Sequence, residues 1–496
     1  MTTGEHGIMW WNSTTPRATR TRVFVAVLER VRTLWDRLPI PRSGLRGAPP
    51  MQKSRTAWGK PARAFLLMFV LVDLLGTGLL MTPAASAGPE ELTLVEATFT
   101  STTSLAVCGL SVISIGGDLS VFGQLVVLAL IQVGGIGIMT LASLLGAALI
   151  HRFSLRMQLN VQAENRAQAV GDVRSIVSRV VIVCLTIEAV TFVIITPRMW
   201  LGHDLSPGEA LYSGLFHSVS AFNNAGLSLY DESLTRFSGD GIILFTVAVA
   251  VILGGIGFPV LLELRHHWRT PGAWGLHTKI TIVTSALLFG VTALLIIMME
   301  WNNPRTLGEL HWWAKISDGF FHGVMPRSGG FNVTDTGAMY DSTLLLTIMM
   351  MFVGNGSAGT AGGIKVATLA VIFLVVWSEA RAHTRVHVFG RRLAPDVIRQ
   401  SLSLTFLSMT VVAITTVFFL HTTPFTFMQT LFEVVSAVGV VGLSTGITPA
   451  LAPWAQLTLA FLMIAGRIGP ITFVTALAFR ERKRRYDLPE ARPMIG

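Results

Sequence analysis

Long apolar stretches occupy most of the chain between residues 64 and 480, and short polar connections separate them. A helix needs about 20 apolar residues to cross the hydrocarbon core of a bilayer. Eight stretches come near or above this length with at most one Asp, Glu, Lys or Arg each: 64–81, 120–150, 180–196, 241–262, 280–299, 342–378, 401–420 and 451–479. The pattern therefore predicts eight transmembrane helices and an all-α integral membrane protein.

The composition favours the same class. Charged residues make up 13% of the 496 residues and the apolar set AVILMFWYC 51%, whereas soluble domains average about 25% charged residues. These values exclude disordered, collagen-like and coiled-coil proteins. The two cysteines, Cys108 and Cys184, are too few for a disulfide framework, and their spacing fits no zinc motif.

The net charge of +10 is distributed unevenly. Of the 38 Lys and Arg residues, 30 lie before residue 64, after residue 479, or in the alternate connections 151–175, 263–279 and 379–399. Positively charged connections stay on the cytoplasmic side, so both termini are predicted to be cytoplasmic in a multi-pass protein of the cell membrane. The excess charge thus indicates topology and contact with membrane lipids, and no nucleic acid is expected as a partner.

Four short apolar segments between the predicted helices resemble one another. Each begins with an aromatic and a polar residue and reaches a glycine nine or ten residues later. The segments are 99–111, 216–228, 321–332 and 432–444, with glycines Gly109, Gly226, Gly330 and Gly442. They are too short to cross a bilayer, so we interpret them as re-entrant half-helices that end in an extended glycine turn. Four loops that cap a helical bundle are the alternative.

A second glycine motif follows each of these glycines by 24 to 32 residues, at 134–137, 254–257, 362–365 and 466–469. Each unit is therefore predicted to be helix, re-entrant segment and helix. A half-helix directs the partial negative charge of its C-terminus toward the membrane centre. Non-helical backbone is tolerated at that depth only where it faces protein or water. Four such ends around one axis, followed by backbone carbonyls, would form a cation site.

With these motifs the chain resembles the pore subunit of the Trk/Ktr/HKT superfamily of potassium transporters, most closely the bacterial Ktr type. The resemblance rests on FHSVSAFNNAGLS (216–228), MPRSGGFN (325–332), FEVVSAVGVVGLSTG (432–446), IQVGGIGIMT (131–140) and GRIGPIT (466–472). It implies four helix–pore loop–helix repeats around a central pore, at 64–150, 151–264, 265–378 and 379–480. A basic cytoplasmic segment, 1–63, would precede them, and a basic tail, 481–496, would follow.

The resemblance also implies potassium as the transported ion and a selectivity filter that binds it. The filter segments would be Val107, Cys108 and Gly109; Asn224, Ala225 and Gly226; Ser328, Gly329 and Gly330; and Val440, Val441 and Gly442. The sodium-selective plant branch has Ser in place of the first glycine, so Gly109 matches the potassium-preferring pattern. Cys108 departs from the usual Thr, and we expect it to be tolerated because backbone carbonyls coordinate the ion. A sodium-permeable member is the alternative, and no organic cofactor is expected.

A small and polar stretch, 354–363, interrupts the predicted helix 342–378. It matches the nucleotide motif G-x-G-x-x-G, but that motif requires a strand–turn–helix unit, so we reject nucleotide binding. In the family this stretch is the intramembrane gate, and we call it the gate loop; a plain helix kink is the alternative. The predicted gate residues are Gly354, Gly356, Ser357, Gly359, Gly362, Gly363, Lys365 and Arg467.

Four Asp, Glu, Lys or Arg residues lie within the predicted spans, and Arg327 lies in the third re-entrant segment. Charges inside a membrane are costly unless they face a cavity or a partner. Lys365 and Arg467 are expected to repel cations or to hold the gate loop shut, with snorkelling or a carboxylate partner as the alternative. Asp73 and Glu188 are expected to satisfy partners in the bundle rather than to bind ions. Arg327 is expected at the filter mouth, where it would brace the loop.

Two other function classes compete with this interpretation. An intramembrane enzyme lacks support, because H-E-x-x-H does not occur and the single G-x-S-x-G match, 442–446, begins at the fourth glycine of the repeated segments. A secondary carrier with broken helices would have inverted repeats of order two, whereas the four repeats here share one orientation. The resemblance further implies a homodimer and a separate cytoplasmic ring of nucleotide-binding regulatory subunits. Residues 22–40 form an amphipathic pattern with a basic face, which favours the inner leaflet, with partner docking as the alternative.

Overall fold

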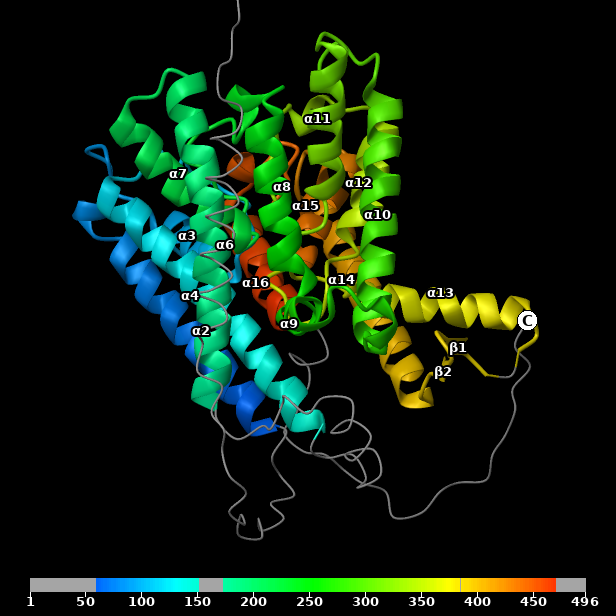
Figure 1. Ribbon diagram of the computed structural model, residues 1–496. Coiled ribbons are helices and arrows are strands. Elements are labelled where there is room, and N and C mark those ends of the chain that lie inside the picture. Colours follow the sequence, from blue (N-terminus) through cyan, green and yellow to red (C-terminus); the bar gives the residue numbers. More distant parts are fainter. Residues whose placement is uncertain (1–58, 151–172, 384, 470–496) are drawn as a thin grey trace, which may run out of the picture. The chain divides into compact units, whose positions relative to one another are not determined.

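The computed structural model describes residues 59–150, 173–383 and 385–469, which all belong to one compact unit, Thr56–Gly496 (Figure 1). Most of the basic N-terminal segment, the amphipathic pattern at 22–40 and the basic tail lie outside the described residues. Within the described ranges the strands are one antiparallel pair, β1 (His387–Val388) and β2 (Arg391–Arg392). Nearly all other regular structure is helical, which confirms the predicted all-α class.

Four units of helix, short helix and helix follow one another along the chain, as predicted. Their helices are α2 (Gly59–Leu80), α3 (Leu94–Ala106) and α4 (Val121–Ile150); α6 (Val173–Gly202), α7 (Pro207–Phe222), α8 (Gly241–Ile256) and α9 (Phe258–His267); α10 (Leu276–Glu300), α11 (Trp312–Val324), α12 (Asp341–Met351) and α13 (Val366–Ala380); and α14 (Pro395–Thr422), α15 (Phe427–Gly439) and α16 (Pro453–Ile468). We call α3, α7, α11 and α15 the re-entrant helices.

Length and apolar composition qualify four of the described helices to cross a membrane by themselves, namely parts of α4, α6, α10 and α14. The bent pair α8 and α9 makes a fifth span if the two are taken together. Helices α2, α12 and α13 contain shorter apolar segments, and the described part of α16 ends at Ile468. These elements overlap the eight stretches predicted as spans, and four or five of them meet the length and composition of a span in the described residues.

Two predicted spans are not continuous helices. The stretch 241–262 was predicted as one helix, but it bends by 102° between α8 and α9. The bend lies at Gly257, which has φ +103°, and Pro259 follows in the first turn of α9. Proline starts a helix readily but disrupts a helix interior. The stretch 342–378 is interrupted by the gate loop, and α13 then runs sideways rather than continuing α12 (Figure 1).

The four units close into a ring through the re-entrant helices. Each of these helices packs against helices of its own unit and against one helix of the preceding unit: α7 on α4, α11 on α8, α15 on α12, and α3 on α16. The last contact joins the first unit to the fourth. The units therefore surround a common axis, as the repeats predicted.

Three re-entrant helices begin with the same side-chain device. Thr93, Ser206 and Thr426 each accept a hydrogen bond from the backbone three residues later, where a Glu or Gln bonds back to the cap. This capping box satisfies backbone donors that a helix start leaves unpaired. The re-entrant helix of the third unit, α11, has His311 at its N-cap, and this side chain makes no such bond. Local sequence thus sets the beginning of three of the four re-entrant helices.

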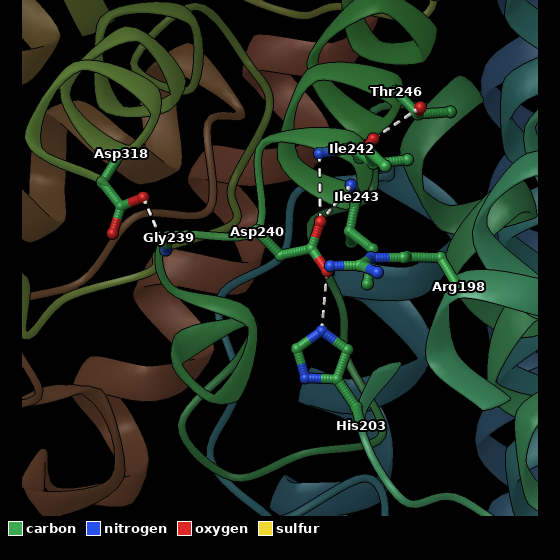
Figure 2. Close-up of polar contacts among 8 residues, drawn as sticks. All are labelled: Arg198, His203, Gly239, Asp240, Ile242, Ile243, Thr246 and Asp318. Carbon is green, nitrogen blue, oxygen red and sulfur yellow. Dashed lines mark hydrogen bonds and ion pairs between the residues drawn. The ribbon is translucent and has the colours of Figure 1, made fainter. Parts of the chain in front are cut away.

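A polar cluster joins the second and third units between the beginning of α8 and the middle of α11 (Figure 2). Asp240 caps the first turn of α8 and accepts hydrogen bonds from Arg198 Nε at 2.7 Å and His203 Nε2 at 2.8 Å. The neighbouring Gly239 donates its N–H to Asp318 of α11 at 2.9 Å. Burial raises the pKa of Asp240, but the hydrogen bonds from His203 and Arg198 outweigh it and hold that pKa below its usual value.

Candidate functional site

The four predicted glycines, which lie more than 100 residues apart in sequence, meet at one place in the structure. A Cβ atom built on Gly226 would lie 2.6 Å from Cα of Gly330, and one on Gly442 would lie 2.8 Å from Cα of Gly109. All four have positive φ, between +67° and +109°. Glycine adopts this conformation without the steric cost that a side chain brings. Both the backbone conformation and the close approach therefore require glycine here.

Carbonyl oxygens of the preceding residues complete a closed ring. Each glycine approaches the carbonyl of the next unit: Gly109 that of Ala225, Gly226 that of Gly329, Gly330 that of Val441, and Gly442 that of Cys108. A Cβ on Gly226 would lie 3.0 Å from the Gly329 oxygen, and one on Gly330 would lie 2.8 Å from the Val441 oxygen. Rings of backbone carbonyls can replace the hydration shell of a potassium ion. The four predicted segments thus meet in one closed ring.

Each filter segment starts with a residue in the left-handed conformation. Val107, Asn224, Ser328 and Val440 have φ values of 56°, 61°, 64° and 53°. This conformation is a genuine outlier for a β-branched residue such as valine. In the first and fourth units it is held by bonds of the next amide: Cys108 N–H to the Thr103 carbonyl and Val441 N–H to the Ser436 carbonyl, both 2.9 Å. In the first and fourth units the left-handed residue is also the C-cap of the re-entrant helix.

Polar side chains on three re-entrant helices fasten the segment that follows the filter. His217 Nε2 lies 2.9 Å from Ser228 Oγ, and His322 Nε2 lies 2.9 Å from Thr334 Oγ1. Glu433 accepts hydrogen bonds from the Ser444 hydroxyl at 2.5 Å, the Thr445 amide at 3.0 Å and the Thr448 hydroxyl at 2.8 Å.

These residues stand directly after the aromatic that opens each repeat. The sequence showed the recurring position but did not reveal its role. In the first unit the same position is Thr100, a buried residue whose hydroxyl has no partner among the described residues. Three of the four units therefore carry this fastening.

The second glycine motif lets the following helix approach the end of its own re-entrant helix. A Cβ at the first glycine of the motif would overlap a backbone carbonyl four residues before the filter glycine in three units: Gly134 with Leu105, Gly254 with Phe222, and Gly466 with Val438. The third unit differs, because Gly362 packs instead against Val440 and the Gly439 carbonyl of the fourth unit. The exception coincides with the gate loop.

The gate loop is a closed loop and not a kinked helix. Its two ends meet in a bridge between Val353 and Ile364, and Gly354 N–H donates to the Ile364 carbonyl at 2.8 Å. On one side its backbone bonds to the end of α8: Gly356 N–H donates to the Gly255 carbonyl at 3.0 Å. Gly359 packs against the same carbonyl, and Gly363 packs against Gly439 on the other side. Ser357 lies at the α8–α9 bend, where its carbonyl contacts Gly257.

Lys365 and Arg467 both bind carbonyl oxygens of the gate loop. Lys365 Nζ donates to Ala361 at 2.5 Å and lies 3.4 Å from the Gly362 carbonyl. Arg467 is 5% exposed; its Nη1 donates to the Thr360 carbonyl and its Nη2 lies 3.4 Å from the Gly134 carbonyl. No carboxylate in the described part of the chain pairs with either cation. The two predicted cations therefore contact the loop directly.

Arg327 does not lie at the filter mouth, so that prediction was wrong. Its side chain is fully buried beneath the third filter segment, where Nη2 donates to the Gly354 carbonyl at 2.9 Å and Nη1 to the Ser285 carbonyl at 3.3 Å. The guanidinium also lies 4.3 Å from the centre of the Phe289 ring. The residue faces the gate loop because the chain turns back at Ser328, after Arg327 and before the filter glycine.

The two predicted intramembrane acids have partners in the bundle. Asp73 accepts hydrogen bonds from the Ser101 and Thr102 hydroxyls at 2.8 and 2.9 Å. Glu188 accepts from Gln132 Nε2 at 3.1 Å and Asn223 Nδ2 at 3.0 Å. No cluster of His, Cys, Asp and Glu able to hold a metal ion occurs within the described residues. These contacts agree with a structural role for both acids.

Known proteins of similar sequence cover most of this chain. The Ktr system potassium uptake protein B of Bacillus subtilis (strain 168) is 35% identical over 422 residues, 85% of this chain and 94% of that protein. Its namesake in Vibrio alginolyticus is 33% identical over 454 residues, 90% and 97% of the two chains. The potassium/sodium uptake protein NtpJ of Enterococcus hirae is 29% identical over 447 residues, 88% and 97%.

The fold has a solved counterpart as well. The crystal structure of the potassium transporter TrkH from Vibrio parahaemolyticus matches 92% of this chain and 91% of its own, with a TM-score of 0.67 and 17% identity. The family model TrkH, described as a cation transport protein, matches residues 67–484. The chain therefore belongs to the TrkH family of cation transport proteins.

Proposed function

We propose that this chain is the pore-forming membrane subunit of a Ktr-type potassium uptake system. The closed ring in which each filter glycine meets the carbonyl of the next unit carries the proposal. Such a ring supplies oxygen ligands from four units at one point, which suits a partly dehydrated potassium ion. The names of the relatives support uptake of potassium, and membership of a transporter family supports a transporter rather than an enzyme.

The filter comprises residues 107–109, 224–226, 328–330 and 440–442, with potassium at the four glycines. Because the ligands are backbone oxygens, Cys108 serves as well as threonine would. A sodium-permeable pore is the second candidate, since one relative is named a potassium/sodium uptake protein. Competition of sodium with potassium uptake separates the two.

The gate loop and its two cations form the gate. The loop lies against the filter segments, and Lys365 and Arg467 bind its carbonyls. Withdrawal of the loop would open the ion path. A cytoplasmic ring of nucleotide-binding regulatory subunits withdraws the loop. The pore subunit itself forms a homodimer.

Both termini face the cytoplasm in this proposal. The connection between α13 and α14 then lies on the same side and exposes Arg381, Arg385 and the Arg391–Arg392 strand. Basic connections of this kind, with the tail, offer the docking surface for the regulatory ring and for anionic lipid.

Rescue of cells that lack potassium uptake tests the function. Wild-type protein, expressed with its regulatory subunit, is expected to restore growth at low external potassium. Gly226→Ser and Gly442→Ser are expected to fail, because a side chain would enter the glycine ring. Gly290→Ser is the matched control, since a Cβ at Gly290 meets open space on α10. Failure of the wild-type chain to rescue would overturn the proposal.

A further inference from the structure

The gate loop is hydrogen-bonded to the filter itself, and the contact with the second unit is made by two fully buried side chains. Thr360 Oγ1 donates to Asn224 Oδ1 at 3.0 Å and lies 3.4 Å from the Phe222 carbonyl. Thr360 and Asn224 are both 0% exposed. Asn224 is the left-handed residue from which the second filter segment starts. The loop thus holds the turn that orients the Ala225 and Gly226 backbone.

The contact with the third and fourth units passes through Ser328. The amide of Gly362 in the loop donates to Ser328 Oγ at 3.1 Å, and this hydroxyl donates in turn to the Val440 carbonyl at 2.5 Å. Ser328 and Val440 are the left-handed residues of their filter segments. One hydroxyl therefore ties the loop to two filter segments at once.

A second pair of bonds joins the loop to the residue before Ser328. Arg327 donates to the Gly354 carbonyl at 2.9 Å, and Asn355 Nδ2 donates to the Arg327 carbonyl at 3.0 Å. Both residues are buried, with 0% and 1% exposure. Buried polar groups that lose their partners pay a desolvation penalty. The loop cannot leave this position without breaking bonds that shape the third filter segment.

Whether the left-handed residue is polar depends on its contact with the gate loop and not on its backbone conformation. Asn224 and Ser328 are polar, and both bond to the loop, whereas Val107 and Val440 are apolar at the equivalent positions. All four adopt the same backbone conformation. Filter geometry alone therefore does not require a polar side chain. The polar residues occur in the second and third units, where the side chain of the left-handed residue bonds to the gate loop.

We propose that the gate loop sets the shape of the filter, so that gate position and ion selectivity are coupled, with Thr360, Ser328 and Arg327 as positioning residues. The inference rests on the proposed function and extends it. With the loop withdrawn, the turns of the second and third units lose their support, and the carbonyl ring relaxes. Linkage then requires the reciprocal effect: potassium bound in the filter favours the loop position that supports it.

Potassium binding to the purified full-length protein in detergent tests the coupling. Calorimetric titration with potassium and with sodium gives both affinities in the wild type and in Thr360→Val, which removes the hydroxyl and keeps the shape. The variant is expected to bind potassium about fivefold more weakly, the effect of one ordinary hydrogen bond. Sodium affinity is expected to change less, so the potassium-to-sodium ratio falls. Thr360→Ser is expected to restore the wild-type ratio.

Thr347→Val is the matched control, because Thr347 is also buried but donates only within α12, to the Thr343 carbonyl at 2.8 Å. Unchanged potassium affinity and ratio in Thr360→Val would overturn the coupling and leave the proposed function standing. A wild-type protein that binds no potassium would overturn the proposed function itself. If Thr360→Val does not fold, Ser328→Ala breaks the contact from the filter side, and an unchanged ratio there overturns the coupling equally.

Discussion

Arg467 lies on α16 and binds the gate loop. Replacing it by glutamine removes this link. The guanidinium donates to the Thr360 carbonyl, while its second nitrogen lies 3.4 Å from the Gly134 carbonyl of the first unit. A glutamine amide is shorter and uncharged, so it cannot reach both oxygens. The substitution therefore weakens the closed position of the loop without touching the filter carbonyls.

The magnitude follows from the bonds lost. A hydrogen bond from a charged donor contributes about 1.5–3 kcal/mol, and the long contact to Gly134 adds little because hydrogen bonds weaken with distance. A loss of about 2 kcal/mol shifts the ratio of open to closed loop about 30-fold, since each 1.36 kcal/mol is a factor of ten. Where the closed state predominates, the basal flux rises by a similar factor.

Uptake of radioactive rubidium into liposomes that hold the purified chain without a regulatory subunit measures this flux. Arg467→Gln and a deletion of residues 357–361 are both expected to raise it. Arg198→Gln is the control, because Arg198 pairs with Asp240 away from the gate loop. Basal uptake at the wild-type level in both gate variants, with unchanged protein incorporation, would refute the reasoning.

Three further predictions concern the supports of the site. Asp240→Asn is expected to lower the free energy of unfolding by about 1 kcal/mol at pH 7. Because folding lowers the pKa of Asp240, this difference is present above about pH 3.9 and is lost as the pH falls further, through the lowered pKa of the folded state. Melting curves across pH check it, and Asp396→Asn, in an exposed pair, is the silent control. Gly254→Ala is expected to cost about 1–3 kcal/mol by overpacking and to reduce uptake, unlike Gly290→Ala. Glu433→Gln is expected to lower the melting temperature and potassium uptake together, because the amide replaces one acceptor oxygen of a buried carboxylate; normal values for both would contradict its fastening role.

The fold was predictable from sequence because its signals are local. Span length is set by bilayer thickness, and the four glycines recur because backbone at the ring leaves no room for a Cβ. Each of these features leaves a mark in a short stretch of sequence, although the close approach of the glycines is between different units. Pattern alone was therefore enough to predict four units around an axis.

The details that failed depend on contacts between distant segments. Helix α8 ends at Ile256, and the following Gly257 meets the carbonyl of Ser357, which lies 100 residues further along the chain. Arg327 turns away from the filter mouth because its partners are the carbonyls of Ser285 and Gly354. Neither partner is recognisable from the residues around Arg327. Sequence periodicity carries no information on such pairings.

The contacts of the gate loop explain why the third unit breaks the fourfold pattern. In a ring of four, the third unit has the second and fourth as neighbours. Its loop hydrogen-bonds to Gly255 and Asn224 of the second unit and packs against Gly439 of the fourth. Arg467 then joins the loop to the first unit at Gly134. A segment linked to all three other units lies across the axis that they surround. This position across the axis is what the proposed gate requires, because an ion that leaves the proposed filter would pass along that axis.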